Sequence, residues 1–118
     1  MSVGGELNGA PEVRREQMIR AALEVIQERG FPDTRLADVA QRAGVSPALV
    51  IYYFGTKDSL LTEAMRYSED AFYDLGARRM AAASSAKARL EEIVALNCLP
   101  TDEDEVGDSW TLWLDLWA

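Results

Sequence analysis

Apolar residues recur along the chain with the three- and four-residue spacing of amphipathic helices. The first such run begins at Pro11 and ends at Gly30. Proline fits the first turn of a helix, where its missing N–H costs nothing, and glycine fits the left-handed residue that ends one. No segment alternates apolar and polar residues across a turn dipeptide, as a hairpin would. The pattern predicts an all-α fold.

Two short helices are predicted after the first one. Residues 35–43 keep their apolar positions on one side, with Thr34 as the N-cap and Gly44 as the terminator. Residues 47–54 follow, with Ser46 as the N-cap and a proline in the first turn. The two helices are separated by a single short turn.

A longer helix is predicted from Thr56 through Leu75, because the apolar residues keep to one face for about five turns. Ser84 and Ser85 interrupt the alanine-rich stretch that follows. Another helix is then predicted, and it ends before Pro100.

Residues 110–118, "WTLWLDLWA", are predicted to form a last helix after an acidic loop at residues 101–108. The segment is apolar on all sides, which is typical of a helix inside a bundle. The chain stops at Ala118 in the middle of this pattern. We therefore expect either that the sequence is a fragment of a longer protein or that this helix is buried against another chain.

The composition is that of one globular domain, with 118 residues of which 48% are hydrophobic and 27% charged. Residues 1–11 lack apolar periodicity and are predicted to be a flexible tail. No apolar stretch is long enough to cross a membrane and no signal peptide is recognisable, so a cytoplasmic protein is expected. The lone Cys98 lies in an apolar helical pattern and is predicted to be a small core residue.

The net charge of −8 argues at first against a nucleic-acid partner. However, residues 1–60 carry seven Lys and Arg against eight Asp and Glu, a net charge of −1. Residues 61–118 carry five against twelve, a net charge of −7. The acidity therefore belongs mostly to the second half of the chain.

Two short helices joined by a tight glycine turn, after a longer helix, form the helix-turn-helix of nucleic-acid recognition. Ala40 suits the point where the two helices cross, and Gly44 permits the positive φ of the turn. Val39, Val45 and Val50 are placed to pack the pair over the first helix.

The segment "GFPDTRLADVAQRAGVSPALVIYYFGTKDSLL" combines this turn with an aromatic-rich helix end and a lysine before a Leu-Leu pair. In these features residues 12–75 resemble the DNA-binding region of TetR-family transcriptional repressors. The resemblance implies an all-helical homodimer that binds a palindromic double-stranded operator and is released by a small-molecule inducer, without cofactor or metal. It implies a DNA-binding domain at 12–57, with the motif at about 35–54, and a partial ligand-binding and dimerisation domain at 58–118.

The helix-turn-helix also indicates which side chains face DNA. Hydroxyls at the helix starts and on the tyrosines suit phosphate oxygens, and Lys57 lies at a helix N-terminus, where its charge and free N–H groups suit an anion. Residues 47–49 are apolar, so base reading would depend on thymine methyl groups. The expected DNA contacts are Thr34, Arg35, Ser46, Pro47, Ala48, Leu49, Tyr52, Tyr53 and Lys57. Further candidates for backbone contacts are Arg14, Arg15 and Arg42.

The two adjacent tyrosines have a second interpretation, in which one belongs to the core and the other is a surface aromatic. The stripe of Trp110, Trp113 and Trp117 is interpreted first as core, and the alternative is an aromatic site for a cationic inducer.

Enzyme chemistry is not predicted, because the chain has no histidine, no Gly-rich phosphate loop and no metal-spaced cysteines. The acidic run at 102–108 lacks the residue order of a calcium loop. The alternative to a DNA-binding regulator is a helix-turn-helix module that serves protein association and has little DNA affinity of its own.

Overall fold

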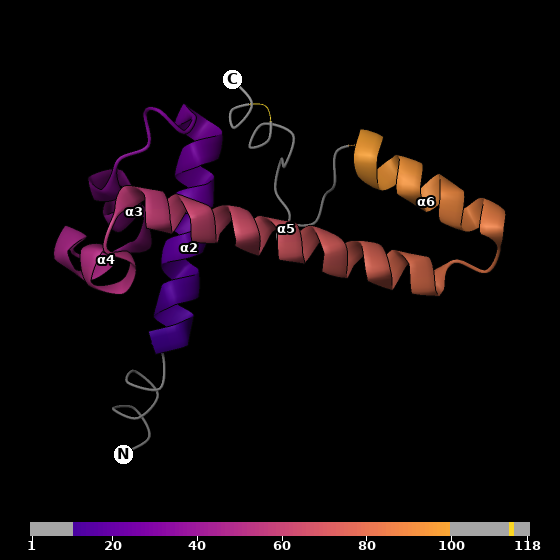
Figure 1. Ribbon diagram of the computed structural model, residues 1–118, viewed down its shortest axis with the longest axis horizontal. Coiled ribbons are helices and arrows are strands. Elements are labelled where there is room, and N and C mark those ends of the chain that lie inside the picture. Colours follow the sequence, from indigo (N-terminus) through magenta and orange to yellow (C-terminus); the bar gives the residue numbers. More distant parts are fainter. Residues whose placement is uncertain (1–10, 100–113, 115–118) are drawn as a thin grey trace, which may run out of the picture.

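The computed structural model describes residues 11–99 and residue 114, and the described part folds into helices without a strand (Figure 1). The helices are α2 (Pro11–Arg29), α3 (Leu36–Ala43), α4 (Pro47–Phe54), α5 (Lys57–Ala82) and α6 (Ala86–Cys98). The predicted all-α fold is confirmed. Most of the predicted tail, the acidic loop and the Trp-rich segment except Leu114 lie outside the described residues.

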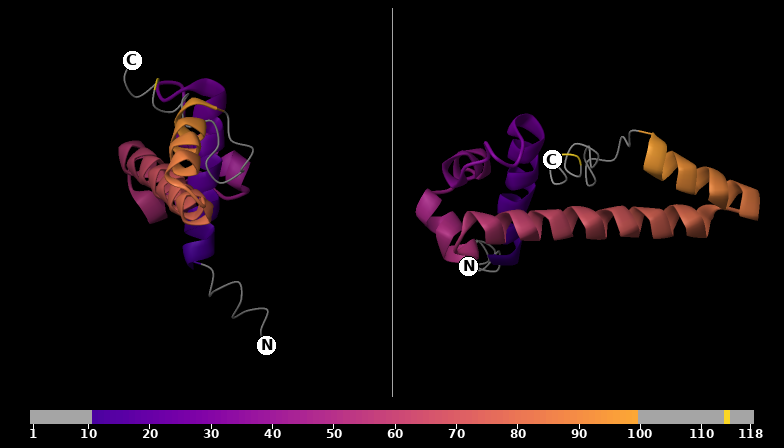
Figure 2. Two further views of the ribbon diagram at one scale, coloured as in Figure 1. Left: turned by 90° about the vertical axis from the view of Figure 1, so that its right-hand side faces the viewer. Right: turned by 45° about the horizontal axis from the view of Figure 1, so that its top comes forward.

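The helices are arranged as a compact group and an arm. Figure 1 shows α2, α3 and α4 gathered at one end, with α5 crossing α2 and continuing away from the group. Helix α6 turns back beside the far half of α5, and the second view in Figure 2 shows the same arrangement. The long helix predicted from Thr56 is therefore the element that joins the two parts.

One core holds α2, α3, α4 and the first half of α5 together. The predicted apolar stripe of α2 points into it, and Met18 and Ile26 are fully buried. Val39 from α3, Val50 from α4 and Leu60 from α5 are also fully buried. Burying each such side chain contributes about 1.5–3 kcal/mol, so these contacts between helices stabilise segments too short to be helical alone.

The helix ends follow from residues that the sequence displays. The Ser46 hydroxyl oxygen accepts a hydrogen bond from the Leu49 amide at 3.2 Å, and Pro47 occupies the first turn of α4. Gly44 ends α3 with a φ of 70° and Gly55 ends α4 with a φ of 78°. The predicted cap and terminators of the helix-turn-helix are confirmed.

The prediction that Thr34 is the N-cap of α3 is wrong. Arg35 occupies the N-cap position, and no side chain caps the helix there. Thr34 is 1% exposed, and its hydroxyl donates a hydrogen bond to the carbonyl oxygen of Gly30 at 2.7 Å. The chain turns back between α2 and α3, and this hydrogen bond of Thr34 closes the turn.

A second, small cluster joins α5 and α6, with Leu75 and Leu96 buried at its centre. Since α6 packs on α5 alone among the described helices, most of its apolar side chains stay exposed, including Leu90 and Val94. Cys98 is exposed too, so the prediction that it is a core residue is wrong. An apolar pattern marks a face that can be buried, but among the described residues no helix covers Cys98.

Gly44→Ala is expected to lower the free energy of unfolding by about 1–2 kcal/mol, because an alanine is strained in the left-handed region. An added Cβ would meet nothing within 4 Å, so the cost is conformational and not steric. Urea denaturation followed by circular dichroism measures the change.

Gly76→Ala is the matched control, because the same methyl group is added inside α5, where it lies 3.7 Å from the Leu96 Cδ1 atom. That substitution is expected to be neutral or to stabilise by up to about 1 kcal/mol. Equal losses in the two variants would contradict the role given to the Gly44 backbone.

Candidate nucleic-acid interface

Helix α4 has an inner and an outer face. Val50 and Phe54, one turn apart, point into the core. Ala48, Ile51 and Tyr52 lie on the opposite side and are exposed, with Tyr52 at 83%. The outer face of α4 therefore leaves Ala48, Ile51 and Tyr52 accessible to a binding partner.

The two adjacent tyrosines take different roles. Tyr53 is half-buried and packs against the main core, whereas Tyr52 projects outward. Their rings meet edge to face, with centroids 5.7 Å apart and planes at 85°. The interpretation that one tyrosine belongs partly to the core is confirmed for Tyr53, and the contact between the rings restrains the outward Tyr52.

The structure divides the predicted base-reading residues. Pro47 and Ala48 are exposed at the start of α4, whereas Leu49 is half-buried and packs on the core. Ile51, which is not among the predicted contacts, is 49% exposed on the same side as Ala48. The three-residue spacing from Ala48 could have identified Ile51, since Val50 and Phe54 already define the inward face.

Lys57 is the first residue of α5 and lies beside the loop that joins α2 to α3. Its ammonium Nζ is 3.5 Å from the carbonyl oxygen of Pro32, the outer limit of a hydrogen bond, so its donors remain available. The Thr56 hydroxyl accepts from the Ser59 amide at 3.1 Å. The N–H groups of Lys57 and Asp58 are left at the open end of the helix, where backbone donors lack partners within the helix.

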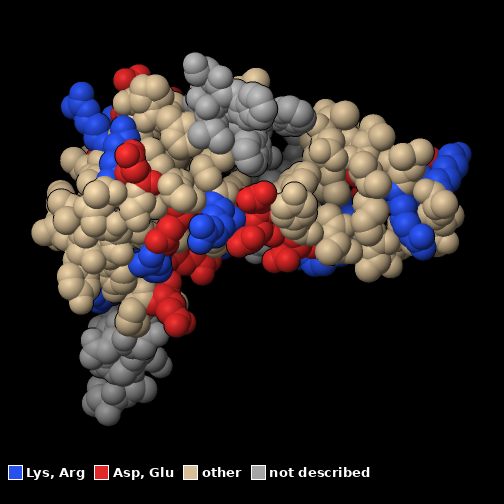
Figure 3. Space-filling view, in the orientation of Figure 1, with Lys and Arg blue, Asp and Glu red and all other residues tan. Residues whose placement is uncertain are grey.

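Most arginines of α2 and α3 already have carboxylate partners. Arg42 lies 3.0 Å from a Glu24 oxygen and 2.7 Å from a Glu28 oxygen. The hydrogen bond to Glu28 raises the pKa of the Arg42 guanidinium and lowers the pKa of the Glu28 carboxyl. Figure 3 shows acidic and basic side chains interleaved where α5 crosses α2. These pairs explain how a chain with many arginines on α2 presents little net positive charge there.

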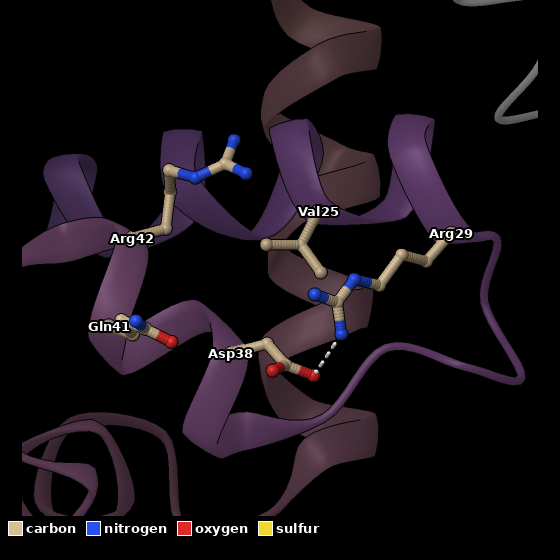
Figure 4. A pocket seen from close by; sticks show the side chains of 5 residues that line it. All are labelled: Val25, Arg29, Asp38, Gln41 and Arg42. Carbon is tan, nitrogen blue, oxygen red and sulfur yellow. Dashed lines mark ion pairs between the residues drawn. The ribbon is translucent and has the colours of Figure 1, made fainter.

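The hollow between α2 and α3 is one of these paired regions and measures about 380 Å³. Figure 4 shows the Arg29 guanidinium directed at the Asp38 carboxylate, with Nη1 and Oδ2 2.9 Å apart. The same Asp38 oxygen makes no well-aligned hydrogen bond, so the contact is an ion pair only. The hollow is lined by Val25, Arg29, Asp38, Gln41 and Arg42. Of the predicted DNA contacts, Arg42 lines the hollow, and its guanidinium is already paired with Glu24 and Glu28.

Of the cations from α2 to the start of α5, three have no carboxylate partner among residues 11–99. They are Arg14 on α2, Arg35 at the start of α3 and Lys57 at the start of α5. Arg35 is exposed at the end of the loop that joins α2 to α3, and Lys57 contacts Pro32 of the same loop. Unpaired cations beside an exposed helix are suited to phosphate groups.

Three predicted DNA contacts are engaged within the chain, and the first is Arg42, which pairs with Glu24 and Glu28. Thr34 is buried and its hydroxyl proton is used within the chain, so it offers nothing to a phosphate. Arg15 is engaged by Glu63 and by the Tyr53 carbonyl. The proposed inducer residues Trp110, Trp113 and Trp117 lie outside the described residues.

Other classes of site were sought across the described helices. In that part of the chain, no cluster of acidic, histidine or cysteine side chains is arranged to hold a metal ion. None of the described helices combines the length and apolar character required to cross a membrane.

Comparison with known proteins points to the same segment. Residues 18–64, which run from α2 into α5, match the family of bacterial regulatory proteins named the tetR family. No solved structure gives a significant match to the chain.

Curated relatives match over a longer stretch. HTH-type transcriptional regulator BetI of Burkholderia mallei (strain NCTC 10229) is 43% identical over 112 residues, which are 93% of this chain and 56% of the relative. The BetI of Burkholderia ambifaria (strain MC40-6) is 42% identical over the same shares. The chain thus spans about half the length of these relatives. Residues 18–64, which contain the helix-turn-helix, thus form a domain of the tetR family of bacterial regulatory proteins.

Proposed function

We propose that the chain is the DNA-binding part of a transcriptional regulator that recognises a specific double-stranded sequence, acts as a repressor and is released by a small molecule. The observation that carries the proposal is the exposed face of α4 between the Ser46 cap and Lys57. The family match and the name of the BetI relatives support it.

The dimensions of α4 suit a groove of DNA. A helix with its side chains is about 10–12 Å in diameter, which fits the major groove of about 12 Å, and the eight residues of α4 extend about 12 Å along the helix axis. Ala48, Ile51 and Tyr52 would face the base edges or the adjoining backbone. Because this face is mostly apolar, discrimination would come from thymine methyl groups and from DNA shape, without the bidentate hydrogen bonds that arginine or asparagine supplies.

Phosphate contacts would flank this face. The Ser46 hydroxyl accepts the Leu49 amide and still has its own proton to donate. Tyr52 supplies a phenol, and Lys57 supplies a charge at the N-terminus of α5. The proposed contact set is Arg35, Ser46, Pro47, Ala48, Ile51, Tyr52, Tyr53 and Lys57, with Leu49 at its half-buried edge.

Regulation would act through α5. This helix runs without interruption for 26 residues, from the core beneath α4 to the hairpin with α6 (Figure 1). We assign residues 12–57 to DNA binding and 58–118 to part of a ligand-binding and dimerisation domain. A ligand that tilts α5 would shift α4, so operator and inducer would weaken each other's binding reciprocally.

The proposal also includes a symmetric homodimer. Two copies with α4 in successive major grooves would bind a palindromic operator in the cytoplasm, and the loss of one copy would remove much of the affinity. The direct experiment is selection of duplex DNA from a random pool, with the solution mass of the protein measured by light scattering. Recovery of a palindrome by a dimer supports the proposal, whereas failure to enrich any sequence favours the protein-association alternative.

Lys57→Ala is expected to weaken binding to all duplexes alike. If Lys57 neutralises one phosphate, the slope of log affinity against log salt concentration should become about 0.9 less negative. Fluorescence anisotropy across a salt series measures both quantities.

Lys87→Ala is the control, because this lysine is on α6 and its side chain is 87% exposed. It should leave the salt slope unchanged. A Lys57→Ala slope equal to that of the original protein would remove Lys57 from the contact set.

Tyr52→Phe is expected to reduce DNA affinity about fivefold, the equivalent of one hydrogen bond worth about 1 kcal/mol. The free energy of unfolding should change by less than about 0.5 kcal/mol, since Tyr52 is 83% exposed. Tyr73→Phe, at a tyrosine that is 65% exposed on α5, is the control and should bind DNA normally. Equal DNA affinity of the two variants would show that the Tyr52 hydroxyl makes no contact.

A further inference from the structure

The guanidinium of Arg15 connects three helices at one point. From α2 its Nε donates to Glu63 Oε2 on α5 at 3.0 Å, and its Nη2 pairs with the other oxygen of the same carboxylate. Its Nη1 donates to the Tyr53 carbonyl oxygen near the end of α4 at 3.1 Å. The guanidinium carbon also lies 4.6 Å from the centre of the Phe54 ring.

The carbonyl that Arg15 reaches is one of those that a helix leaves unpaired at its C-terminus. The Gly55 amide donates to the Ile51 carbonyl at 2.7 Å, and the Thr56 amide donates to the Phe54 carbonyl at 3.0 Å. Arg15 serves the Tyr53 carbonyl, which lies between these two along the chain. A cation at this end is also favourable for the helix dipole.

The joint lies between the proposed DNA contacts. Tyr52 and Tyr53 precede it on α4, and Lys57 follows it on α5, six positions before Glu63. Only Gly55 and Thr56 separate the two helices, and Gly55 has the positive φ of 78°. Direct packing of α4 on α5 is much less extensive than that of α3 on α2. The angle between α4 and α5 therefore depends strongly on side chains that bridge them.

From this geometry we propose that Arg15 is a positioning residue for DNA binding: with Glu63 and the Tyr53 carbonyl it fixes the end of α4 against α5. This inference rests on the proposed function. Arginine suits the task because its planar fork engages both carboxylate oxygens while a third N–H reaches the carbonyl. Lysine keeps the charge but is a single point, so it cannot hold all three acceptors in this geometry.

The pair acts through geometry more than through stability. The side chains of Arg15 and Glu63 are 38% and 29% exposed, and ion pairs this accessible to water contribute little to folding. A small change in the angle of α4 would nevertheless displace Tyr52 and Lys57 relative to each other. Phosphate and base contacts tolerate such displacements poorly, because the groups must reach the same duplex together.

The first test needs no DNA. In the full 118-residue chain, Arg15→Ala and Glu63→Gln should each speed hydrogen exchange at the α4 C-terminal amides about threefold to tenfold, while exchange in α3 stays unchanged. Arg20→Ala is the control, because Arg20 pairs with Glu16 on α2 and lies over the Tyr67 ring without contacting α4. Unchanged exchange at the end of α4 in the Arg15 and Glu63 variants would overturn the inference.

The second test asks whether Glu63→Gln raises or lowers the DNA affinity. If charge alone governed affinity, Glu63→Gln would strengthen binding, because it removes a negative charge near the phosphates. The positioning role instead requires Glu63→Gln to weaken binding about threefold to tenfold, to the duplex recovered by selection and to random duplex DNA. Arg15→Lys should weaken DNA binding similarly. If Arg15 instead contacted a phosphate directly, lysine would largely preserve the affinity.

The double variant Arg15→Ala with Glu63→Gln completes the cycle. Its loss of DNA affinity should match that of Arg15→Ala alone, because both substitutions break the same contact between Arg15 and Glu63. Binding by Glu63→Gln as tight as that of the original protein, or additive losses, would overturn the inference. If the exchange results hold and the original protein binds no duplex, the proposed function fails while the joint between the helices stands.

Discussion

Everything that the candidate interface presents depends on the burial of one edge of α4. A helix of eight residues is not stable in isolation, because its nucleation cost exceeds what so few hydrogen bonds return. Val50 and Phe54 bury that edge against the core formed with α2, α3 and α5. Since the inner edge is held, the outer edge with Ala48, Ile51 and Tyr52 is presented in a fixed direction. A helix whose outer face is already fixed in direction loses less conformational entropy on binding than a flexible segment does.

Ion pairing within the described helices decides which cations of this acidic chain remain open to a partner. Carboxylates on α2 and α3 engage Arg20, Arg29 and Arg42, while Arg35 and Lys57 beside α4 remain without such partners in the described residues. Interactions between exposed charges fade beyond about 10 Å in ordinary salt, so the local set matters more than the net charge of −8. The net charge would instead suppress non-specific association with nucleic acid.

Helix α5 gives the molecule two parts with different packing. Its first half is covered by α2 and completes the main core, with Leu60 and Ala64 fully buried. Its second half meets α6 alone among the described helices, through the small cluster around Leu75. A motion of the second half would reach α4 through the covered half and through the Arg15 bridge, because α5 is continuous.

The sequence by itself determined the helices, their order and the helix-turn-helix. These features depend on local rules, namely the apolar period, the Ser46 cap, Pro47 in a first turn and the positive φ of Gly44 and Gly55. They also sufficed to place Tyr52 and Lys57 near the turn between α4 and α5. The division of the tyrosines into one partly buried and one outward followed from the same period.

Only the tertiary structure decided which side chains remain available. Thr34 resembles a cap in sequence, yet the fold turns its hydroxyl toward Gly30 and buries it. Arg15 and Lys57 look alike as cations, but 48 residues along the chain Glu63 folds back onto Arg15, whereas Lys57 meets no carboxylate in the described part. Cys98 has an apolar pattern but no neighbour there to cover it. Partners distant in sequence set burial and pairing, so no local period or motif can specify them.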